Sequence, residues 1–276
     1  MNLERRRRAD ALPAWRGAFV LAVVLLAACA GRAHAQPPVT DRSRFEFAAA
    51  TWLASPSVTT QGERAGIPGT PIDFRSDFGL TGHVLPVLQG AIRTGRRHLF
   101  SAEYIPIRYT TNAALGRDVT FAGAVYPAGT STQGIVSWQA LSADYEYDVS
   151  VRRRVATGIV FGFDWTDVQV RLRNASTNEL TSASVQYVPA AGLITRVRAT
   201  KTLVLTGKAS GSYVPDKPNQ EYGGHLLNAR VGGTLALGKT FAADLGVRVI
   251  DIRHLGKADS GTMRMSGVYF GVVARR

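Results

Sequence analysis

Residues 141–149 read Leu-Ser-Ala-Asp-Tyr-Glu-Tyr-Asp-Val, and this stretch decides the fold class. Its odd positions are apolar or aromatic, whereas its even positions are Ser142, Asp144, Glu146 and Asp148. A period of two residues is typical of a β-strand, in which successive side chains point to opposite faces. The stretch therefore predicts a strand with one apolar and one acidic face.

The same alternation recurs in three other segments, at residues 155–165, 227–237 and 241–249. In each, mostly apolar residues occupy one face, and small or polar residues occupy the other. After residue 36 there is no run of eighteen apolar residues and no helical stripe, which excludes a helical membrane protein. Repeated two-faced strands instead indicate an all-β protein.

Strand length separates two β architectures. Strands of a soluble sandwich average about 5–6 residues, whereas strands of a membrane barrel need about 9–11 and turn their apolar face to lipid. The alternating segments here are long, which favours the barrel. We predict ten strands, at residues 45–55, 82–93, 98–112, 135–148, 155–171, 184–198, 202–214, 222–237, 240–253 and 261–275.

The connections between these strands alternate in length. Short turns are predicted at 94–97, 149–154, 199–201 and 238–239, and long loops at 56–81, 113–134, 172–183, 215–221 and 254–260. An outer-membrane barrel has short periplasmic turns and long external loops, and an even strand count places both termini in the periplasm. We therefore predict an antiparallel up-and-down transmembrane β-barrel over residues 36–276.

The first 35 residues predict a cleaved secretory signal peptide. Four consecutive Arg residues and Arg16 precede an apolar run at 17–30, and Ala33-His34-Ala35 is a small-residue cleavage site. As a helix the run rises about 21 Å, less than the roughly 30 Å of a bilayer core, which argues against an anchor. Residues 26–29, Leu-Ala-Ala-Cys, leave open lipoprotein processing at Cys29, the sole cysteine.

The chain carries 33 Lys and Arg against 20 Asp and Glu, a net charge of +13. Cleavage after Ala35 removes six Arg and two acidic residues, which lowers the charge to +9. A basic protein would ordinarily suggest a nucleic-acid partner, but export separates this chain from nucleic acid. We expect no nucleic-acid partner and an integral outer-membrane location in a Gram-negative-type bacterium.

Five segments of the mature chain resemble a widespread family of bacterial outer-membrane β-barrel-domain proteins, mostly without assigned function. They are Ile-Asp-Phe-Arg-Ser-Asp-Phe-Gly-Leu at 72–80, Tyr-Ile-Pro-Ile-Arg-Tyr at 104–109, Arg-Asp-Val-Thr-Phe at 117–121, Tyr-Pro-Ala-Gly-Thr at 126–130 and Ser-Gly-Val-Tyr-Phe-Gly at 266–271. The resemblance implies the same fold and location, and it assigns no catalytic residue.

Projection of the strands places a set of mostly charged side chains toward the lumen. They are Glu46, Glu103, Asp144, Glu146, Asp164, Lys208, Asn228, Arg230, Asp244, Arg248 and Arg264. Because buried charges must be paired, one interpretation is a structural plug of ion pairs that fills the bore. The alternative is a narrow channel for small solutes, whose selectivity these charges would set.

Basic residues gather at the predicted periplasmic turns. The principal ones are Arg96, Arg97, Arg152, Arg153, Arg154, Lys201 and Lys239, and Arg42, Arg44, Arg93, Arg196, Arg198, Arg275 and Arg276 lie in or beside the same turns and termini. One hypothesis is that this basic rim faces anionic lipid headgroups or the acidic cell wall, at about 1 kcal/mol for each charge. The other is that these are ordinary solvated turn residues.

No catalytic, cofactor or metal motif is found in the sequence, so we expect no enzyme activity and no cofactor. A less favoured alternative is a barrel enzyme, such as a protease using Asp167, Asp251 and His254 near the outer rim, or a lipid A-modifying hydrolase. The expected role is structural, surface-interacting or limited in permeability. The expected partners are outer-membrane lipid, lipopolysaccharide and the barrel assembly machinery, with a monomeric protein.

Overall fold

The computed structural model describes residues 44–276, apart from 65–66, 216–221 and 257–258. The predicted signal peptide and Cys29 lie outside the described residues. Within the described part of the chain, no helix is long and apolar enough to cross a membrane.

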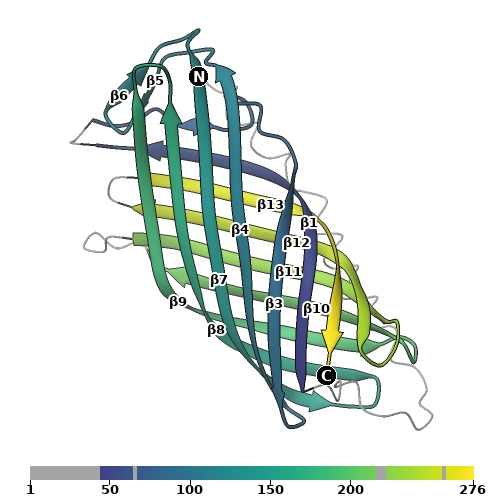
Figure 1. The fold of residues 1–276 in the computed structure, drawn as a ribbon. Helices are drawn as coiled ribbons and strands as arrows, with labels where there is room; N and C mark the ends of the chain where they lie inside the picture. Colours follow the sequence, from purple (N-terminus) through teal and green to yellow (C-terminus); the bar gives the residue numbers. More distant parts are fainter. Residues whose placement is uncertain (1–43, 65–66, 216–221, 257–258) are drawn as a thin grey trace, which may run out of the picture.

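Ten long antiparallel strands form one closed sheet in the described chain (Figure 1). In spatial order they follow the sequence, and the last strand pairs with the first over seventeen residue pairs from Glu46–Arg275 to Gly62–Asp259. The strands are β1 (Phe45–Gly62), β3 (His83–Thr94), β4 (His98–Ala114), β7 (Ser131–Val151), β8 (Val155–Arg173), β9 (Asn178–Arg198), β10 (Leu203–Val214), β11 (Tyr222–Ala236), β12 (Phe241–Gly256) and β13 (Asp259–Arg275). The predicted up-and-down barrel of ten strands is confirmed.

The two ends of the barrel differ in their connections. Turns of a few residues join the strands at the end where β1 begins and β13 ends, here called the turn end. The β3–β4 turn closes around Gly95, whose φ of 85° lies in the left-handed region that glycine adopts at low cost. The two longest connections, from β1 to β3 and from β4 to β7, lie at the opposite end, here called the loop end, and contain the short strands β2 (Ile72–Asp73), β5 (Val119–Phe121) and β6 (Ala124–Tyr126). The predicted long loop at 172–183 was wrong, because β8 and β9 continue into it and only residues 174–177 join them.

Several strands extend farther toward the loop end than the sequence predicted. β1 continues to Gly62 instead of residue 55, β7 begins at Ser131 instead of 135, and β9 begins at Asn178 instead of 184. The prediction followed the apolar outward face, and on β1 and β7 that face becomes polar toward the loop end. The missed outward residues there are Ser57, Thr59 and Gln61 on β1 and Ser131 and Gln133 on β7.

The change is visible in residues that pair across β4, β7 and β8 and therefore share the outward face. From the turn end the first rows are His98–Tyr147–Ile159, Phe100–Tyr145–Phe161, Ala102–Ala143–Phe163 and Tyr104–Leu141–Trp165. The next rows are Pro106–Gln139–Asp167, Arg108–Ser137–Gln169, Thr110–Ile135–Arg171 and Asn112–Gln133–Arg173. The outward face is thus mainly apolar or aromatic near the turn end and mainly polar near the loop end.

The inward face shows the opposite order. On β7 the inward side chains run from Ser142, Asp144 and Glu146 near the turn end to buried Trp138 and Val136 near the loop end. β4 behaves alike, with Glu103 followed by buried Ile105, Ile107 and Tyr109. The turn-end half therefore has the polarity of a membrane barrel, and the loop-end half has the apolar interior and polar exterior of a soluble β-protein.

The opposite wall also changes from apolar to polar toward the loop end. The outward row Val231–Val247–Val268–Leu53 is apolar. Two rows nearer the loop end, the outward row is Leu227–Asp251–Arg264–Ser57, which is mostly polar. On β1 the apolar outward band covers nine residues, about 30 Å along the strand, or about 23 Å of membrane thickness at a tilt near 40°. This matches the roughly 25 Å band of membrane barrels, so the loop-end half projects beyond the lipid.

Candidate functional site

The lumen of the turn-end half contains a network of charged side chains, here called the lumen network. Nine of its members were predicted from the sequence, and the structure places them on inward positions: Glu46, Glu103, Asp144, Glu146, Asp164, Lys208, Arg230, Asp244 and Arg248. Asn228 also faces inward. Three further members, Arg93, Asp148 and Arg196, join them through ion pairs.

Glu103 on β4 is the centre of one half of this network. Arg248 Nη2 donates to Glu103 Oε1, and Arg230 Nη1 lies 3.5 Å from Glu103 Oε2. Arg248 also donates through Nε to Asn228 Oδ1 at 3.1 Å, and Arg230 donates to Gln89 at 3.1 Å. One carboxylate therefore holds two guanidinium groups, and neutral amides satisfy further guanidinium donors.

Glu146 and Asp148 on β7 form the other half. Lys208 Nζ donates to Asp144 at 2.8 Å and to Glu146 at 3.1 Å, and Arg196 pairs with Glu146 and Asp148. Arg93 Nη1 lies 3.3 Å from Asp148 Oδ2. The sequence predicted that Arg93 and Arg196 lie at the basic rim. This prediction was wrong, because strand alternation turns both side chains into the lumen just before the strands end.

Two carboxylates in the lumen bond to hydroxyl groups. Asp164 accepts from Ser142 Oγ at 2.8 Å and from Ser212 Oγ at 3.0 Å. Asp244 accepts from Thr234 Oγ1 at 2.9 Å. Hydroxyl groups on β7, β10 and β11 thus satisfy the hydrogen-bonding capacity of carboxylate oxygens inside the lumen.

Arg264 is a correction to the predicted lumen set. Its side chain is 44% exposed, and its Nε lies 3.9 Å from Asp251 Oδ2 on the outward face. On β13 the inward positions are odd-numbered, as buried Met263, Met265 and Tyr269 show. Arg264 therefore stands outside the barrel, above the apolar band.

Little space remains between the lumen side chains. The cavity among Glu103, Lys208, Arg230, Arg248 and their neighbours is about 10 Å³, about the space for one water molecule. A larger cavity of about 130 Å³ lies nearer the turn end, beside Glu46, Arg196 and Asp244. Between the described residues the network therefore nearly fills the bore.

Toward the loop end the lumen network is followed by an apolar layer, here called the apolar plug. Its largest side chains are fully buried: Trp52, Trp138, Tyr109, Ile107 and Leu172. The Arg248 guanidinium lies 5.5 Å from the ring centroid of Trp52, so a cation–π contact joins the network to the plug. The interior thus carries two successive layers of opposite polarity.

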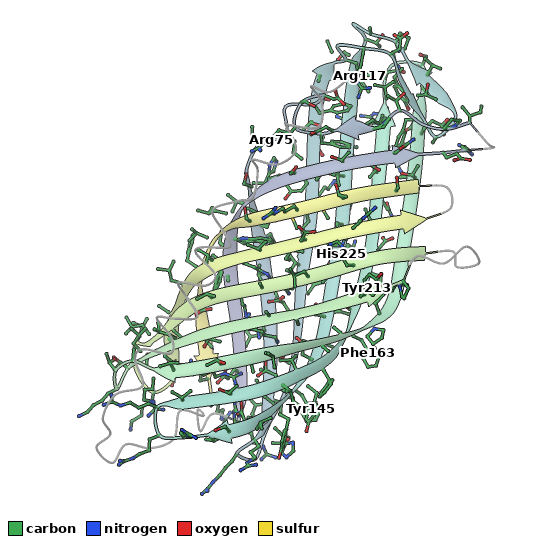
Figure 2. The ribbon with its side chains drawn as sticks, turned by 180° about the vertical axis from the view of Figure 1, so that it is seen from behind. Arg75, Arg117, Tyr145, Phe163, Tyr213 and His225 are labelled. Carbon is green, nitrogen blue, oxygen red and sulfur yellow. The ribbon has the colours of Figure 1, made fainter. Side chains whose placement is uncertain are left out.

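A cap covers the plug at the loop end, where the labelled Arg75 and Arg117 also lie (Figure 2). Its described residues are 63–64, 67–82 and 115–130, with β2 paired to β1 and β5 paired to β6. Its buried apolar side chains are Ile72, Phe74, Phe78, Leu80, Leu115, Val119, Phe121 and Tyr126. Phe74 and Phe78 stack with ring centroids 5.1 Å apart.

Polar contacts hold the two cap loops together and attach the cap to the barrel wall. Arg117 Nη2 lies 3.0 Å from Asp77 Oδ2, and the Ala128 backbone N–H donates to Asp118 at 2.8 Å. The Tyr126 hydroxyl donates to the Leu172 carbonyl of β8 at 2.7 Å, and burial raises the pKa of this phenol above its ordinary value. The cap is therefore a packed element of the fold.

The sequence reading treated these cap segments as loops and missed their role. Three of the five segments that carry the family resemblance, at 72–80, 117–121 and 126–130, form the cap. The sequence feature that could have revealed the cap is the high density of large apolar residues in these segments, which is unusual for exposed loops. Gly134 gives a structural reason for the fit, because a Cβ there would lie 2.9 Å from the Phe74 ring.

The principal residues of the predicted basic rim lie in or beside the short turns. Arg96, Arg97 and Arg152 are exposed, as are Lys201 and Lys239, whereas Arg153 and Arg154 are partly buried. Arg97 Nη1 donates to the Tyr147 hydroxyl at 3.3 Å. The turn end thus presents a ring of cations at the edge of the apolar band.

The residues considered for catalysis do not form one described site. Asp167 lies on β8 and accepts from Gln169, whereas Asp251 lies on β12 and faces His225 Nε2 at 3.0 Å. The His254 side chain lies outside what the structure describes. The sequence did not predict the His225–Asp251 pair, because no spacing rule connects residues 26 positions apart on neighbouring strands. Among the described residues no group of three or more potential ligands could hold a metal ion.

Comparison with known proteins supports the architecture. No protein-family model and no curated protein matches the sequence. Among solved structures, the outer membrane protease OmpT of Escherichia coli is 7% identical with a TM-score of 0.55, and the match covers 88% of this chain and 99% of OmpT. Ail, the attachment invasion locus protein of Yersinia pestis, is 9% identical with a TM-score of 0.38, covering 84% of this chain and 99% of Ail.

The likeness to OmpT shows the fold. Together with the closed barrel of long strands and the outward apolar band, it defines the chain as an integral β-barrel protein of the bacterial outer membrane. The predicted fold class and location are confirmed.

Proposed function

We propose that this chain is a monomeric, non-conducting outer-membrane barrel that holds a rigid, capped head above the membrane, with a structural and surface-interaction role. The observation that carries the proposal is the filled lumen. A solute would have to pass both the inner part of the lumen network, where the cavity beside Glu103 and Lys208 is about 10 Å³, and the buried aromatic side chains of the apolar plug. Displacing either layer would break buried ion pairs or close packing.

The family assignment is part of the proposal. The segments at 72–80, 117–121 and 126–130 build the cap, so their resemblance to outer-membrane β-barrel-domain proteins concerns one structural element. We propose that the chain belongs to that family and that its members share this capped loop end.

The proposed outer partner is lipopolysaccharide. Arg108, Arg171 and Arg173 point outward from β4 and β8, beyond the last apolar row Tyr104–Leu141–Trp165. Arg173 is held by Gln133 at 2.9 Å. Cations placed just above an aromatic girdle suit the phosphate groups of outer-leaflet glycolipid.

Conductance in a planar bilayer tests the closed lumen. We expect the refolded wild-type barrel to give no discrete conductance steps under conditions in which a porin from the same preparation gives them. Reproducible steps whose ion selectivity changes in Glu103→Gln or Lys208→Gln would overturn the proposal and support the narrow-channel alternative.

A further inference from the structure

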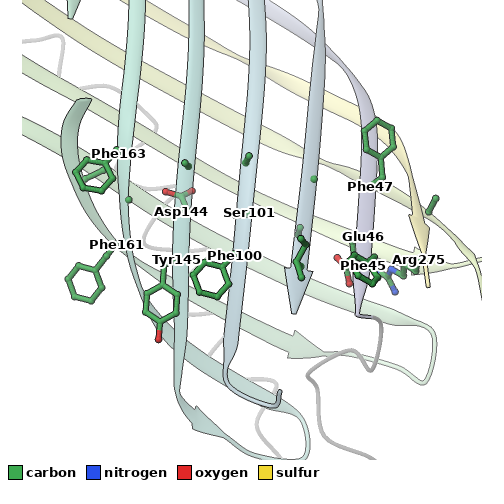
Figure 3. A pocket seen from close by; sticks show the side chains of 18 of the residues that line it. Phe45, Glu46, Phe47, Phe100, Ser101, Asp144, Tyr145, Phe161, Phe163 and Arg275 are labelled. Carbon is green, nitrogen blue, oxygen red and sulfur yellow. The ribbon is translucent and has the colours of Figure 1, made fainter. Parts of the chain in front are cut away.

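An apolar groove of about 1170 Å³ lies on the outward face of the membrane-spanning half (Figure 3). Its floor is one row of small residues, Gly90 on β3, Ala102 on β4 and Ala143 on β7. The same row continues to Phe47 on β1 and Phe163 on β8. Small side chains between two phenylalanines make the hollow.

Aromatic residues also surround the groove toward the turn end. The adjacent row is Phe45–Ile92–Phe100–Tyr145–Phe161, whose four aromatic side chains are labelled in Figure 3. Phe47 and Phe163 remain 57% and 56% exposed. The groove is larger than the roughly 300–1,000 Å³ of pockets for drug-sized ligands, so it suits a long or branched apolar ligand.

Cations stand at the turn-end mouth of this groove. Arg276 lines it directly, and the Arg44 guanidinium lies 5.8 Å from the centroid of the Phe45 ring. On the β7 side of the groove, Arg97 donates a hydrogen bond to the Tyr147 hydroxyl, which lies one outward row closer to the turn end than Tyr145. An apolar hollow with cations at the level of the turns fits a molecule with hydrocarbon chains and an anionic head.

We propose that the groove binds one anionic phospholipid of the periplasmic leaflet, with its acyl chains between Phe47 and Phe163 and its anionic head at the level of Arg44, Arg97 and Arg276. An acyl chain that enters the groove leaves one hydrocarbon environment for another, so hydrophobic transfer contributes little. Retention then depends on the shape of the floor and on charge pairing with the head. Each contribution can be removed separately.

The shape contribution is tested by filling the floor. Ala102→Leu/Ala143→Leu adds bulk to two exposed outward positions, so it obstructs the groove without disturbing the lumen. The matched control is Ala229→Leu/Ala243→Leu, which makes the same change on outward positions of β11 and β12. All variants are first required to show the wild-type gel mobility shift on heating.

The charge contribution is tested by Arg44→Gln/Arg97→Gln/Arg276→Gln. Its control, Arg152→Gln/Arg153→Gln/Lys201→Gln, removes three charges from turns that do not line the groove. Native mass spectrometry then measures retention of added phosphatidylglycerol, phosphatidylcholine with the same chains, or lipopolysaccharide.

We expect the wild-type barrel to retain one phosphatidylglycerol at least about tenfold better than phosphatidylcholine, because the three cations attract a head group with net negative charge and not a zwitterionic one. Both groove variants should lose at least about tenfold in retention, and both controls should keep it. Equal retention across all variants, equal retention of phosphatidylcholine, or preferential retention of lipopolysaccharide at the groove would overturn the proposal. So would a dimer that dissociates in Ala102→Leu/Ala143→Leu, since the occupant would then be a second copy. None of these outcomes depends on whether the lumen conducts.

Discussion

At the scale of single residues, the lumen depends on pairing that strand periodicity could not supply. Alternation places Glu103 and Arg248 on inward faces, but they are 145 positions apart, and closure of the barrel brings them together. The same holds for Lys208 and Glu146. A buried charge costs several kcal/mol unless it is paired, so the network stabilises the fold chiefly by leaving none of these charges alone.

Glu103→Gln should therefore destabilise the barrel strongly. The substitution leaves two guanidinium groups without their shared carboxylate, and loss of one partner of a buried pair typically costs about 3–5 kcal/mol. Denaturant unfolding of the refolded barrel in lipid vesicles measures the effect. The matched variant Glu179→Gln breaks the exposed pair with Arg64, 2.6 Å apart, and should cost at most about 1 kcal/mol. Equal losses in both variants would contradict a lumen held by paired charges.

At the scale of elements, β4, β7 and β8 each change polarity once. On β7 the outward face passes from Tyr145 and Leu141 to Gln139 and Ser137, while the inward face passes from Asp144 to Trp138. Neighbouring strands change at the same level because their residues pair in register. A strand can obey the rule of a membrane barrel over half its length and the rule of a soluble sheet over the other half, provided that its surroundings change from lipid to water there.

Thiol labelling should locate this boundary in intact cells. Single cysteines at Ser137 and Ser57 lie on outward positions beyond the apolar band and should react with a membrane-impermeant maleimide. Cysteines at Ala143 and Ala49 lie within the band and should stay unlabelled. The parent chain serves as the control for Cys29. Labelling of Ala143→Cys, or protection of Ser137→Cys, would show that the membrane lies elsewhere on the barrel.

At the scale of the whole molecule, a continuous ladder of hydrogen bonds closes the barrel. The β13–β1 pairing leaves the sheet without a free edge along its length, so the backbone within lipid is satisfied internally. The cap and the lumen network then fill the interior. Two walls of strands cross steeply in Figure 1, and side chains from opposite walls, such as Arg248 and Glu103, form ion pairs across the lumen.

A closed barrel of this kind should resist unfolding by detergent. Outer membranes run without heating should give a faster-migrating band than the same sample after boiling, because the compact barrel persists in dodecyl sulfate until heated. Identical mobility in both lanes, together with extraction of the protein by carbonate, would indicate a peripheral β-protein.

The sequence by itself determined the all-β class, the ten strands and the inward position of nine lumen residues, because a period of two is a local property of each strand. It misplaced Arg264, because the outward face becomes polar beyond the apolar band and a charged residue there resembles a lumen residue. It also misplaced Arg93 and Arg196, because both lie close to the short turns but turn into the lumen. Only the tertiary structure decided the ion-pair partners, the cap, the change of polarity and the groove between Phe47 and Phe163. These depend on contacts between strands far apart in the chain, and closure of the sheet sets those contacts.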